Sequence, residues 1–564
     1  MCGIFFSLCR SEYVVPDSFT EQLLKNRGPD KIGKHQILIP KNGSDPLYAT
    51  FISTVLSLRG RTVVEQPLRD HDTGSILSWN GEAWTIAGDA VEGNDSQVVF
   101  DILLKSSNTQ SEQSREVSIQ RVVHSLSRIR GPFAFIFYDA KNHLLYYGRD
   151  CLGRRSLLRK STPSGEIVLS SVCDNSSGEE WAEVEADGIY LLDLLHTSKG
   201  DAIDVTHIPH RRSSDEIHDE VSFILPFPTI NQTLDQEQSL PHAENVKAVR
   251  RSLQASLKLR VENVRELSDP NTSRTAQVAI LFSGGLDCTI LARLCHDLLP
   301  LTDPIDLLNV AFENPRIHKN LEAGVSPYEL CPDRVTARAS HAELEKICPN
   351  RLWRLVEINV PYMETMAQRE NVMRLMHPHN TEMDLSISYA LYFASRGTGQ
   401  TKNHESVNIC AYTTPAHVLL SGLGADELFG GYQRHAVAFA RRGYQGLLEE
   451  LALDFNRLGK RNLGRDDRVI SDSGKEVRFP YLDEDFIALA LDLPVYAKCD
   501  FAIPQTETSD DPTNFLEPGK RLLRLLAWDL DMKVVASEKK RAIQFGARTA
   551  KMETGKTKGT HVLS

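Results

Sequence analysis

Residues 278–289 have the sequence Val-Ala-Ile-Leu-Phe-Ser-Gly-Gly-Leu-Asp-Cys-Thr. An apolar run typical of a buried strand ends in Ser283-Gly284-Gly285, and an acid, Asp287, follows two residues later. The leucine-rich segment after Asp287 predicts a helix. A strand that ends in a glycine turn at a helix N-terminus directs backbone N–H groups at one point, where phosphate or pyrophosphate binds. The stretch therefore predicts a nucleotide site within an α/β domain.

Composition limits the class of protein. The chain has 564 residues, 41% of them hydrophobic and 25% charged, which predicts a soluble protein of two or more domains. The formal net charge of −11 argues against nucleic acid or a membrane surface as a partner. We expect no membrane span and no signal peptide. Ten cysteines without Cys-x-x-Cys spacing predict reduced thiols, so we expect a cytoplasmic protein.

The sequence around this stretch predicts more of the same domain. Apolar positions at three- and four-residue steps from His242 predict an amphipathic helix, and the runs 305–312, 352–360 and 417–420 predict further strands. A doubly wound parallel sheet binds its ligand beyond the carboxyl ends of its strands. The last run leads into a second glycine-rich turn that contains Asp426 and Glu427, which could hold Mg²⁺ against ATP phosphates. Two such turns together predict an ATP site.

The N-terminal part carries a different set of residues. If Met1 is removed, Cys2 has both a thiol nucleophile and an α-amine with a pKa near ~8 that can move the proton. Asn80-Gly81 ends a predicted strand and offers the amide and N–H that an oxyanion hole needs. Arg59 and Asp95 could clamp the α-carboxylate and α-amine of a free amino acid. Taken singly, each segment is as well explained by an ordinary turn.

The order of these segments resembles the class II glutamine amidotransferase domain. The matching residues are Cys2-Gly3-Ile4, Arg27-Gly28-Pro29-Asp30, Arg59, Asn80-Gly81-Glu82, Asp95, Gly131–Phe135 and Gly148–Arg155. The resemblance implies an αββα Ntn-type sandwich that hydrolyses glutamine. It implies that Cys2 is the nucleophile and that Asn80 and Gly81 form the oxyanion hole. It also implies that glutamine is held by Arg59, Glu82 and Asp95.

The later motifs resemble a second domain. Ser283–Asp287 is similar to the pyrophosphate loop of N-type ATP pyrophosphatases, and Ser421–Tyr432 and Arg478–Asp483 are similar to two signatures of asparagine synthetases. Residues 332–339, 464–469 and 539–546 resemble a divergent branch, the asparagine synthetase domain-containing proteins. The resemblance covers nearly the whole chain. It implies an amidotransferase domain at 2–205, a connection at 206–245 and a doubly wound ATP pyrophosphatase domain at 246–564.

The resemblance implies a reaction with three substrates: glutamine, aspartate and ATP. Ammonia released at Cys2 would attack an acyl adenylate of aspartate, giving asparagine and AMP after pyrophosphate has left. Lys540, or Arg541 beside it, would stabilise the charge that develops on phosphate. ATP would be bound by Leu281, Ser283, Gly284, Gly285, Asp287, Ser421 and Gly422, with Mg²⁺ on Asp287 and Asp426.

Several positions differ from the synthetase pattern. True synthetases carry an acid three residues before the position of Asp384, the expected general base for the ammonia step, and this chain has Thr381 there. Leu423 stands where the Ser-Gly-x-Gly loop usually has an acid, and Cys288 replaces a serine. Three hypotheses follow: an asparagine-forming enzyme, an amidotransferase–ligase for another carboxylic acid, or a pseudoenzyme that acts as a sensor or scaffold.

Overall fold

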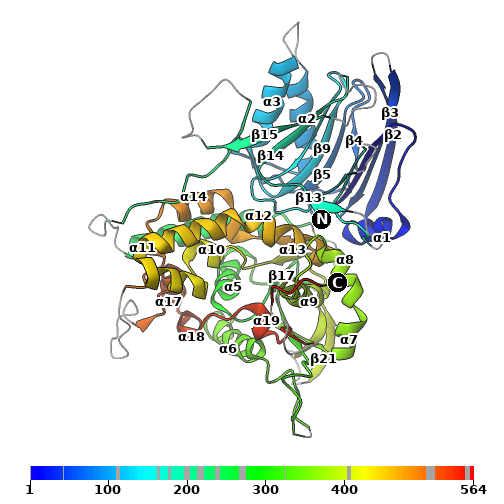
Figure 1. Cartoon of the computed structure of the whole chain (residues 1–564). Coiled ribbons are helices and arrows are strands. Elements are labelled where there is room, and N and C mark those ends of the chain that lie inside the picture. Colours follow the sequence, from blue (N-terminus) through cyan, green and yellow to red (C-terminus); the bar gives the residue numbers. More distant parts are fainter. Residues whose placement is uncertain are drawn as a thin grey trace. The chain divides into compact units, whose positions relative to one another are not determined.

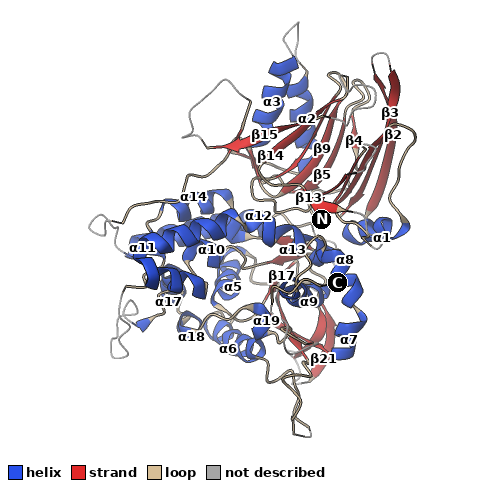
Figure 2. Ribbon diagram, viewed as in Figure 1, coloured by secondary structure: helices blue, strands red, loops and turns tan. Residues whose placement is uncertain are grey.

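The chain forms two compact units (Figures 1 and 2). The computed structural model describes residues 2–41, 44–108, 115–161, 166–175, 180–195, 204–212, 221–234, 242–265, 275–322, 324–402, 408–502, 515–552 and 559–563. The first unit comprises Met1–Pro226, Met373–His379 and Leu458–Gly474, and the second comprises Phe227–Val372, Asn380–Arg457 and Lys475–Ser564. The two units therefore confirm a mixed α/β protein with several sheets, but they are not consecutive pieces of sequence.

The first unit contains two large sheets and a small one. The first large sheet has the order β13 (Trp181–Glu183), β11 (Leu158–Ser161), β12 (Ile167–Ser170), β1 (Gly3–Cys9), β3 (Ser44–Val55), β2 (Lys31–Lys41). The second has the order β16 (Phe223–Ile224), β15 (Val205–Arg211), β14 (Gly188–Asp193), β10 (Leu144–Arg149), β9 (Phe133–Asp139), β5 (Ile76–Gly81), β4 (Leu68–Arg69). The small sheet consists of β7 (Asp89–Ala90), β6 (Thr85–Ile86) and β8 (Ile129–Arg130). The helices are α1 (Ser18–Arg27), α2 (Asp95–Ser107), α3 (Arg115–Ser127), α12 (Leu458–Arg461), α13 (Leu463–Ser471) and the end of α8 (Arg369–Met376).

Strand β9 shows how the layers of this unit pack. Its side chains alternate between two cores, because successive residues of a strand point to opposite faces. Phe135 and Phe137 pack with Phe100 of α2, in the core between the second sheet and the helices α2 and α3. Ile136 packs with Phe6 of β1, in the core between the two large sheets. Figure 1 shows α2 and α3 lying along the sheet that contains β9 and β5. The layers follow the order helices, sheet, sheet, with α1 against β1 and β3.

The second unit is built on one mixed sheet. Its order is β21 (Ile409–Thr413), β20 (Thr398–Lys402), β19 (Trp353–Val360), β18 (Ile305–Phe312), β17 (Val278–Leu281), β22 (Val418–Leu420), β23 (Glu476–Arg478). The strands β19, β18, β17, β22 and β23 are parallel to one another. At one side of the sheet, β20 pairs antiparallel with β19, and β21 pairs antiparallel with β20. All eight residues of β18 are buried, so both faces of the sheet are covered at its centre. In β17 the end residue, Leu281, is only half-buried.

Helices and short turns surround this sheet. The expected amphipathic helix is α4 (His242–Val261), whose buried apolar stripe contains Val249, Leu253, Leu257 and Val261. Among the described residues of this unit, the other helices of thirteen or more residues are α5 (Leu286–Leu298), α6 (Pro332–Ile347), α9 (Glu382–Arg396) and α11 (Gln433–Asn456). Helix α17 (Arg521–Asp529) has nine residues. The shorter ones are α7 (Tyr362–Ala367), α10 (Ala425–Phe429), η2 (Pro480–Leu482), α14 (Glu484–Asp492), α15 (Val495–Lys498), α18 (Lys533–Ser537) and α19 (Ile543–Gly546). None of the helices in the described ranges is both long and apolar enough to cross a membrane.

The predicted connection at 206–245 needs a correction at its start. Residues 205–211 form β15, which pairs with β14 and so belongs to the first unit. In β15 only Ile208 is fully buried, which is why the sequence there gives little strand signal. Residues 213–220 and 235–241 of the predicted connection lie outside the described residues. The same limit applies to Met1, whose removal stays an expectation. All ten cysteines lie in the described residues and none forms a disulfide, which agrees with the predicted reduced thiols.

Substitution of Gly131 tests how closely the backbone packs against Glu82 at this point of the first unit. A Cβ there would lie 1.9 Å from the Glu82 carbonyl oxygen, and its φ is +139°. Gly88 is the matched control, since its φ is +94° but no atom lies within 4 Å of a built Cβ. Both Ala variants carry backbone strain of about 1 kcal/mol. We expect Gly131→Ala to lose about 2 kcal/mol more free energy of unfolding in urea titrations because of the added collision. Equal losses in the two variants would contradict this packing.

Candidate active site

Cys2 lies directly before β1 and is only 9% exposed. Its Sγ is 3.9 Å from Gln66 Nε2, and its carbonyl oxygen accepts a hydrogen bond from Arg27 Nε at 3.3 Å. Gln66 Oε1 accepts from the backbone N–H of Trp79 at 2.8 Å. Gln66 therefore ties the thiol to the end of β5, where Asn80 is the next residue. The sequence did not single out Gln66, because one glutamine before a proline forms no recognisable pattern.

Asn80 has an unusual environment for an amide. It is fully buried, and neither its Nδ2 nor its Oδ1 has a hydrogen-bond partner within the described residues. Leaving a buried amide unpaired costs about 1–3 kcal/mol. At Gly81, which follows it, a Cβ would lie 2.4 Å from the Pro132 carbonyl oxygen. The site therefore presents a free amide donor beside a backbone that only glycine fits, which is the donor arrangement of an oxyanion hole.

The residues predicted to hold glutamine meet at the same turn. Arg59 Nη1 donates to the Ala83 carbonyl at 3.0 Å and lies 3.5 Å from Glu82 Oε2. Asp95 Oδ2 accepts from Ala83 N at 2.8 Å and from Trp79 Nε1 at 3.1 Å. Burial raises the pKa of Asp95, against the effect of Arg59 and of these hydrogen bonds. Asp95 thus supports the turn itself, while Arg59 and Glu82 form a buried ion pair beside it.

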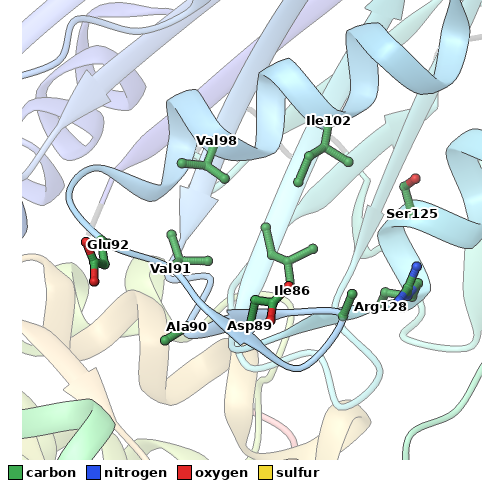
Figure 3. Close-up of a pocket in the computed structure, with 10 residues that line it drawn as sticks. Ile86, Asp89, Ala90, Val91, Glu92, Val98, Ile102, Ser125 and Arg128 are labelled. Carbon is green, nitrogen blue, oxygen red and sulfur yellow. The ribbon is translucent and has the colours of Figure 1, made fainter.

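A cavity of about 410 Å³ lies on the other side of Val91. Figure 3 shows Val98 and Ile102 of α2 above it, with Ile86 and Val91 below. The Val91 carbonyl accepts a hydrogen bond from Arg59. The cavity is lined by Ile86, Ala87, Asp89, Ala90, Val91, Glu92, Val98, Ile102, Ser125 and Arg128. None of the predicted glutamine residues is among these, so the cavity adjoins that site and is separate from it.

In the second unit the three predicted signatures meet at the carboxyl ends of β17 and β22. A Cβ built on Gly422 would lie 2.9 Å from Asp287 Cβ. Tyr481 donates its hydroxyl to the Asp287 carbonyl at 3.1 Å. The backbone N–H of Ser421 donates to the Arg478 carbonyl at 3.0 Å. Turns that lie far apart in the sequence therefore form one surface.

The predicted pyrophosphate loop is held from two sides. Ser283 Oγ accepts from Gly285 N at 3.3 Å. Gly284 has φ +78°, and a Cβ there would lie 2.4 Å from the backbone of Ala337 in α6. Ser340, one turn further along α6, donates to the Gly284 carbonyl at 2.6 Å. Only glycine fits at 284, because a side chain would meet both a left-handed backbone and a helix.

Lys520 lies between the two aspartates that were predicted to bind Mg²⁺. Its Nζ is 2.9 and 2.8 Å from the carboxylate oxygens of Asp287 and 2.9 Å from Asp426 Oδ1. Lys540 pairs with the other oxygen of Asp426. Burial would raise the pKa of Asp426, but the two ammonium groups hold it well below its usual range. Burial would lower the pKa of Lys540, but Asp426 and Asp287 raise it.

Lys520 was missed by the sequence analysis. It is 2% exposed and has φ +53°, a conformation that local sequence does not indicate for lysine. It follows Pro518-Gly519, directly before α17. A lysine after a Pro-Gly turn at the start of an apolar helix was the only available signal.

The positions that differ from the synthetase pattern have structural roles. Thr381 is the N-cap of α9: its Oγ1 accepts from Asp384 N at 3.2 Å, and Asp384 accepts from Thr381 N at 3.3 Å. This capping box uses both side chains. Cys288 is buried and donates its thiol to the Gly285 carbonyl at 3.3 Å, so it packs within the helix start. The half-buried Leu423 brings no charge to its loop.

Asp333 is a second site residue whose role the sequence did not indicate. It lies in the first turn of α6, four and seven residues before Ala337 and Ser340, so all three share one helix face. Those two residues contact Gly284 of the pyrophosphate loop. Asp333 is 7% exposed, and its carboxylate rests against Gly546, where a Cβ would lie 1.9 Å from Asp333 Oδ1.

The charge state of Asp333 is sensitive near neutral pH. Burial raises its pKa to about 7, against the opposing effects of Arg541 and Lys540. Glu538 raises this pKa and Arg548 lowers it. A group of this kind exchanges a proton under physiological conditions, next to the predicted nucleotide loop.

The chain is similar in sequence to several known proteins. The asparagine synthase family profile matches residues 439–558. The chain is 33% identical over 660 aligned residues to asparagine synthetase domain-containing protein 1 of Gallus gallus, covering 100% of this chain and 99% of that protein. An asparagine synthetase domain-containing protein of Saccharomyces cerevisiae is 34% identical over 531 residues, covering 91% and 86%. The glutamine-hydrolysing asparagine synthetase of Homo sapiens is more distant, 24% identical over 387 residues, covering 66% and 58%.

These matches define a protein of the ATP-dependent amidotransferase–ligase class. Within that class, the chain belongs to the family of asparagine synthetase domain-containing proteins, as its motifs predicted.

The raised pKa of Asp333 predicts a pH-dependent stability. Between about pH 4 and pH 7 the folded chain keeps a proton on Asp333 that the unfolded chain has released. The free energy of unfolding is therefore highest below pH 4 as far as Asp333 is concerned. It falls as the pH rises through 7, by at most roughly 4 kcal/mol. Asp333→Asn removes this pH dependence, so the variant should gain stability relative to wild type between pH 5 and pH 8 in urea unfolding. Glu345→Gln, on the exposed side of α6, is the control and should show no such trend. A constant difference between Asp333→Asn and wild type would contradict the raised pKa.

Proposed function

We propose that the chain converts aspartate to asparagine, with glutamine as the nitrogen donor and ATP as the energy source. The observation that carries the proposal is the cluster of Asp287, Lys520, Asp426 and Lys540 at the carboxyl ends of β17 and β22. The charges of the two carboxylates and the two ammonium groups balance. The carboxylates can bind magnesium, and the ammonium groups can bind the oxygens of pyrophosphate. The family membership supports the same class of reaction.

In the glutamine half, the Cys2 thiolate attacks the side-chain amide carbon of glutamine. Asn80 and Gly81 donate hydrogen bonds to the oxyanion that forms. The C–N bond then breaks, ammonia leaves after taking a proton from the Cys2 α-amine, and a thioester remains that water hydrolyses to glutamate. The unpaired, buried amide of Asn80 supports this role because it has a donor to give.

In the ATP half, the β-carboxylate of aspartate attacks the α-phosphate of ATP, and pyrophosphate leaves. Lys520 and Lys540 exchange their carboxylate partners for phosphate oxygens, while the loop residues Ser283–Gly285 donate N–H groups. Asp287 and Asp426 would then hold Mg²⁺, which neutralises phosphate charge. Two carboxylates fit this ion, because Mg²⁺ takes its remaining ligands from phosphate and water. Within the described residues no group of three or more His, Cys, Asp or Glu side chains could hold a metal.

The amide-forming step needs a base, since ammonia must lose a proton after it attacks the adenylate carbonyl. Thr381 and Leu423 cannot accept it, because one is a helix cap and the other is apolar. We assign this role to Asp333. Its buried carboxyl group lies on the face of α6 that contacts the pyrophosphate loop. It takes the proton from nitrogen, the C–O bond to AMP breaks, and asparagine forms.

Cys2→Ala tests the glutamine half. We expect glutamine-dependent amide formation to fall at least 1,000-fold, since no thioester can form, while ammonia-dependent formation stays within about twofold. Amide product is measured by mass spectrometry with either nitrogen source, using protein whose Met1 removal has been verified. Cys9→Ala, a buried thiol in β1, is the control. Glutamine-dependent turnover that survives in Cys2→Ala would exclude this nucleophile.

Asp333→Asn separates the steps of the ATP half. Exchange of labelled pyrophosphate into ATP should stay within about threefold, because adenylation does not use Asp333, while ammonia-dependent amide formation should fall about 100-fold. Glu345→Gln is again the control. An equal loss in both assays would show that Asp333 only maintains the fold of the site.

The acceptor acid is tested with the same exchange assay and a panel of carboxylic acids. Exchange with aspartate supports the proposal. If only another acid supports pyrophosphate exchange, that acid and not aspartate is the substrate. Leu423 favours this alternative, because it is apolar where the synthetase loop usually has an acid. No exchange with any acid, together with no glutaminase activity, would leave a sensor or scaffold.

A further inference from the structure

Helix α13 is unusual because all nine of its residues are buried, although four of them are charged. It belongs to the first unit, yet it lies in the sequence between α11 and β23 of the second. Buried charges are tolerated only when partners compensate for the loss of water. The partners of α13 therefore show what this helix does in the first unit.

Asp467 is the centre of these contacts and is fully buried. Its Oδ2 accepts from Arg27 Nη2 at 2.8 Å and from the backbone N–H of Ser156 at 3.1 Å. The guanidinium of Arg155 lies 3.6 Å from its other oxygen. Arg27 is the C-terminal residue of α1, 440 positions before Asp467 in the chain. Helices α1 and α13 are thus held together by a buried ion pair.

Arg27 continues the connection to the nucleophile. Its Nη1 donates to Ser471 Oγ at 2.6 Å, and its Nε donates to the Cys2 carbonyl oxygen at 3.3 Å. The guanidinium is a planar fork, so fixing two of its nitrogens on α13 also fixes the direction of the third. The main chain of Cys2 is therefore positioned by Asp467 and Ser471 through one side chain.

We propose that Asp467 is a positioning residue for Cys2: it orients Arg27, which holds the main chain of the nucleophile. This role rests on the proposed glutaminase function. The glutamine site is then completed by a helix encoded late in the chain, so the amidotransferase part does not contain all of its own active-site support. A purely structural ion pair would affect stability and leave the chemistry of Cys2 unchanged.

The test uses the full-length chain and the diazoketone analogue of glutamine, which alkylates a nucleophilic cysteine in a glutamine site. We expect Asp467→Asn to lower the maximal alkylation rate of Cys2 about tenfold, because a small displacement of a nucleophile has a large effect on rate. The half-saturating concentration should stay within twofold, since the proposed glutamine residues Arg59 and Glu82 pair with each other and Arg59 also donates to the Ala83 carbonyl. Modified Cys2 is counted by mass spectrometry.

Glu183→Gln is the matched control. Glu183 pairs with Arg468 of the same helix and with Arg149, but its pairs do not include Arg27. We expect the two variants to have similar thermal midpoints of unfolding. The alkylation rate of Cys2 in Glu183→Gln should stay within threefold of the wild-type rate. Equal rates in Asp467→Asn and wild type, or equal losses in both variants, would overturn the positioning role.

Ser471→Ala provides a milder version of the same test if Asp467→Asn does not fold. Loss of one Arg27 anchor should lower the alkylation rate about threefold, and an unchanged rate would contradict the proposal. Failure of the wild-type chain to react with the diazoketone, while iodoacetamide still modifies Cys2, would instead overturn the glutaminase function and this role with it.

Discussion

The ammonium group of Lys520 lies between the carboxylates of Asp287 and Asp426, and the second unit depends on this arrangement. Each aspartate sits on a glycine turn at the end of a different parallel strand, and the two turns touch at Gly422. Asp426 is buried and Asp287 is half-buried, so their carboxylates would repel one another without a cation between them. Lys520 supplies that charge, so the two glycine turns assemble around it. In the proposed function, the same charges would pair with magnesium and pyrophosphate when ATP binds.

The first unit follows the same physical rule with different residues. Asp467, Arg27 and Arg468 are fully or almost fully buried, and each is stable only because its partners arrive from distant parts of the chain. The side-chain amide of Asn80 differs, since neither its nitrogen nor its oxygen has a hydrogen-bond partner in the described structure. A buried polar group without a partner needs a physical explanation. The proposed oxyanion hole supplies one, because the amide would then donate to the reacting glutamine.

Local sequence predicted much of the fold and part of the site. The strands β17, β18 and β22 and the helix α4 follow from apolar periodicity, which depends only on neighbouring residues. The contact between Gly422 and Asp287 follows from parallel strand ends meeting at one edge. Gln66, Lys520 and Asp467 could not be predicted in this way. Each acts through contacts with residues remote in the sequence. Lys520 follows a Pro-Gly turn and Asp467 lies within the motif 464–469, but neither pattern indicates which residues they contact.

The central claim is that two sites in one chain transfer nitrogen from glutamine to an activated acid. The most direct measurement supplies the full-length chain with ATP, magnesium, aspartate and glutamine whose side-chain amide contains heavy nitrogen. We predict asparagine that carries the label, formed in equal amounts with AMP and pyrophosphate. Labelled ammonia without labelled amide, AMP or pyrophosphate would contradict the account.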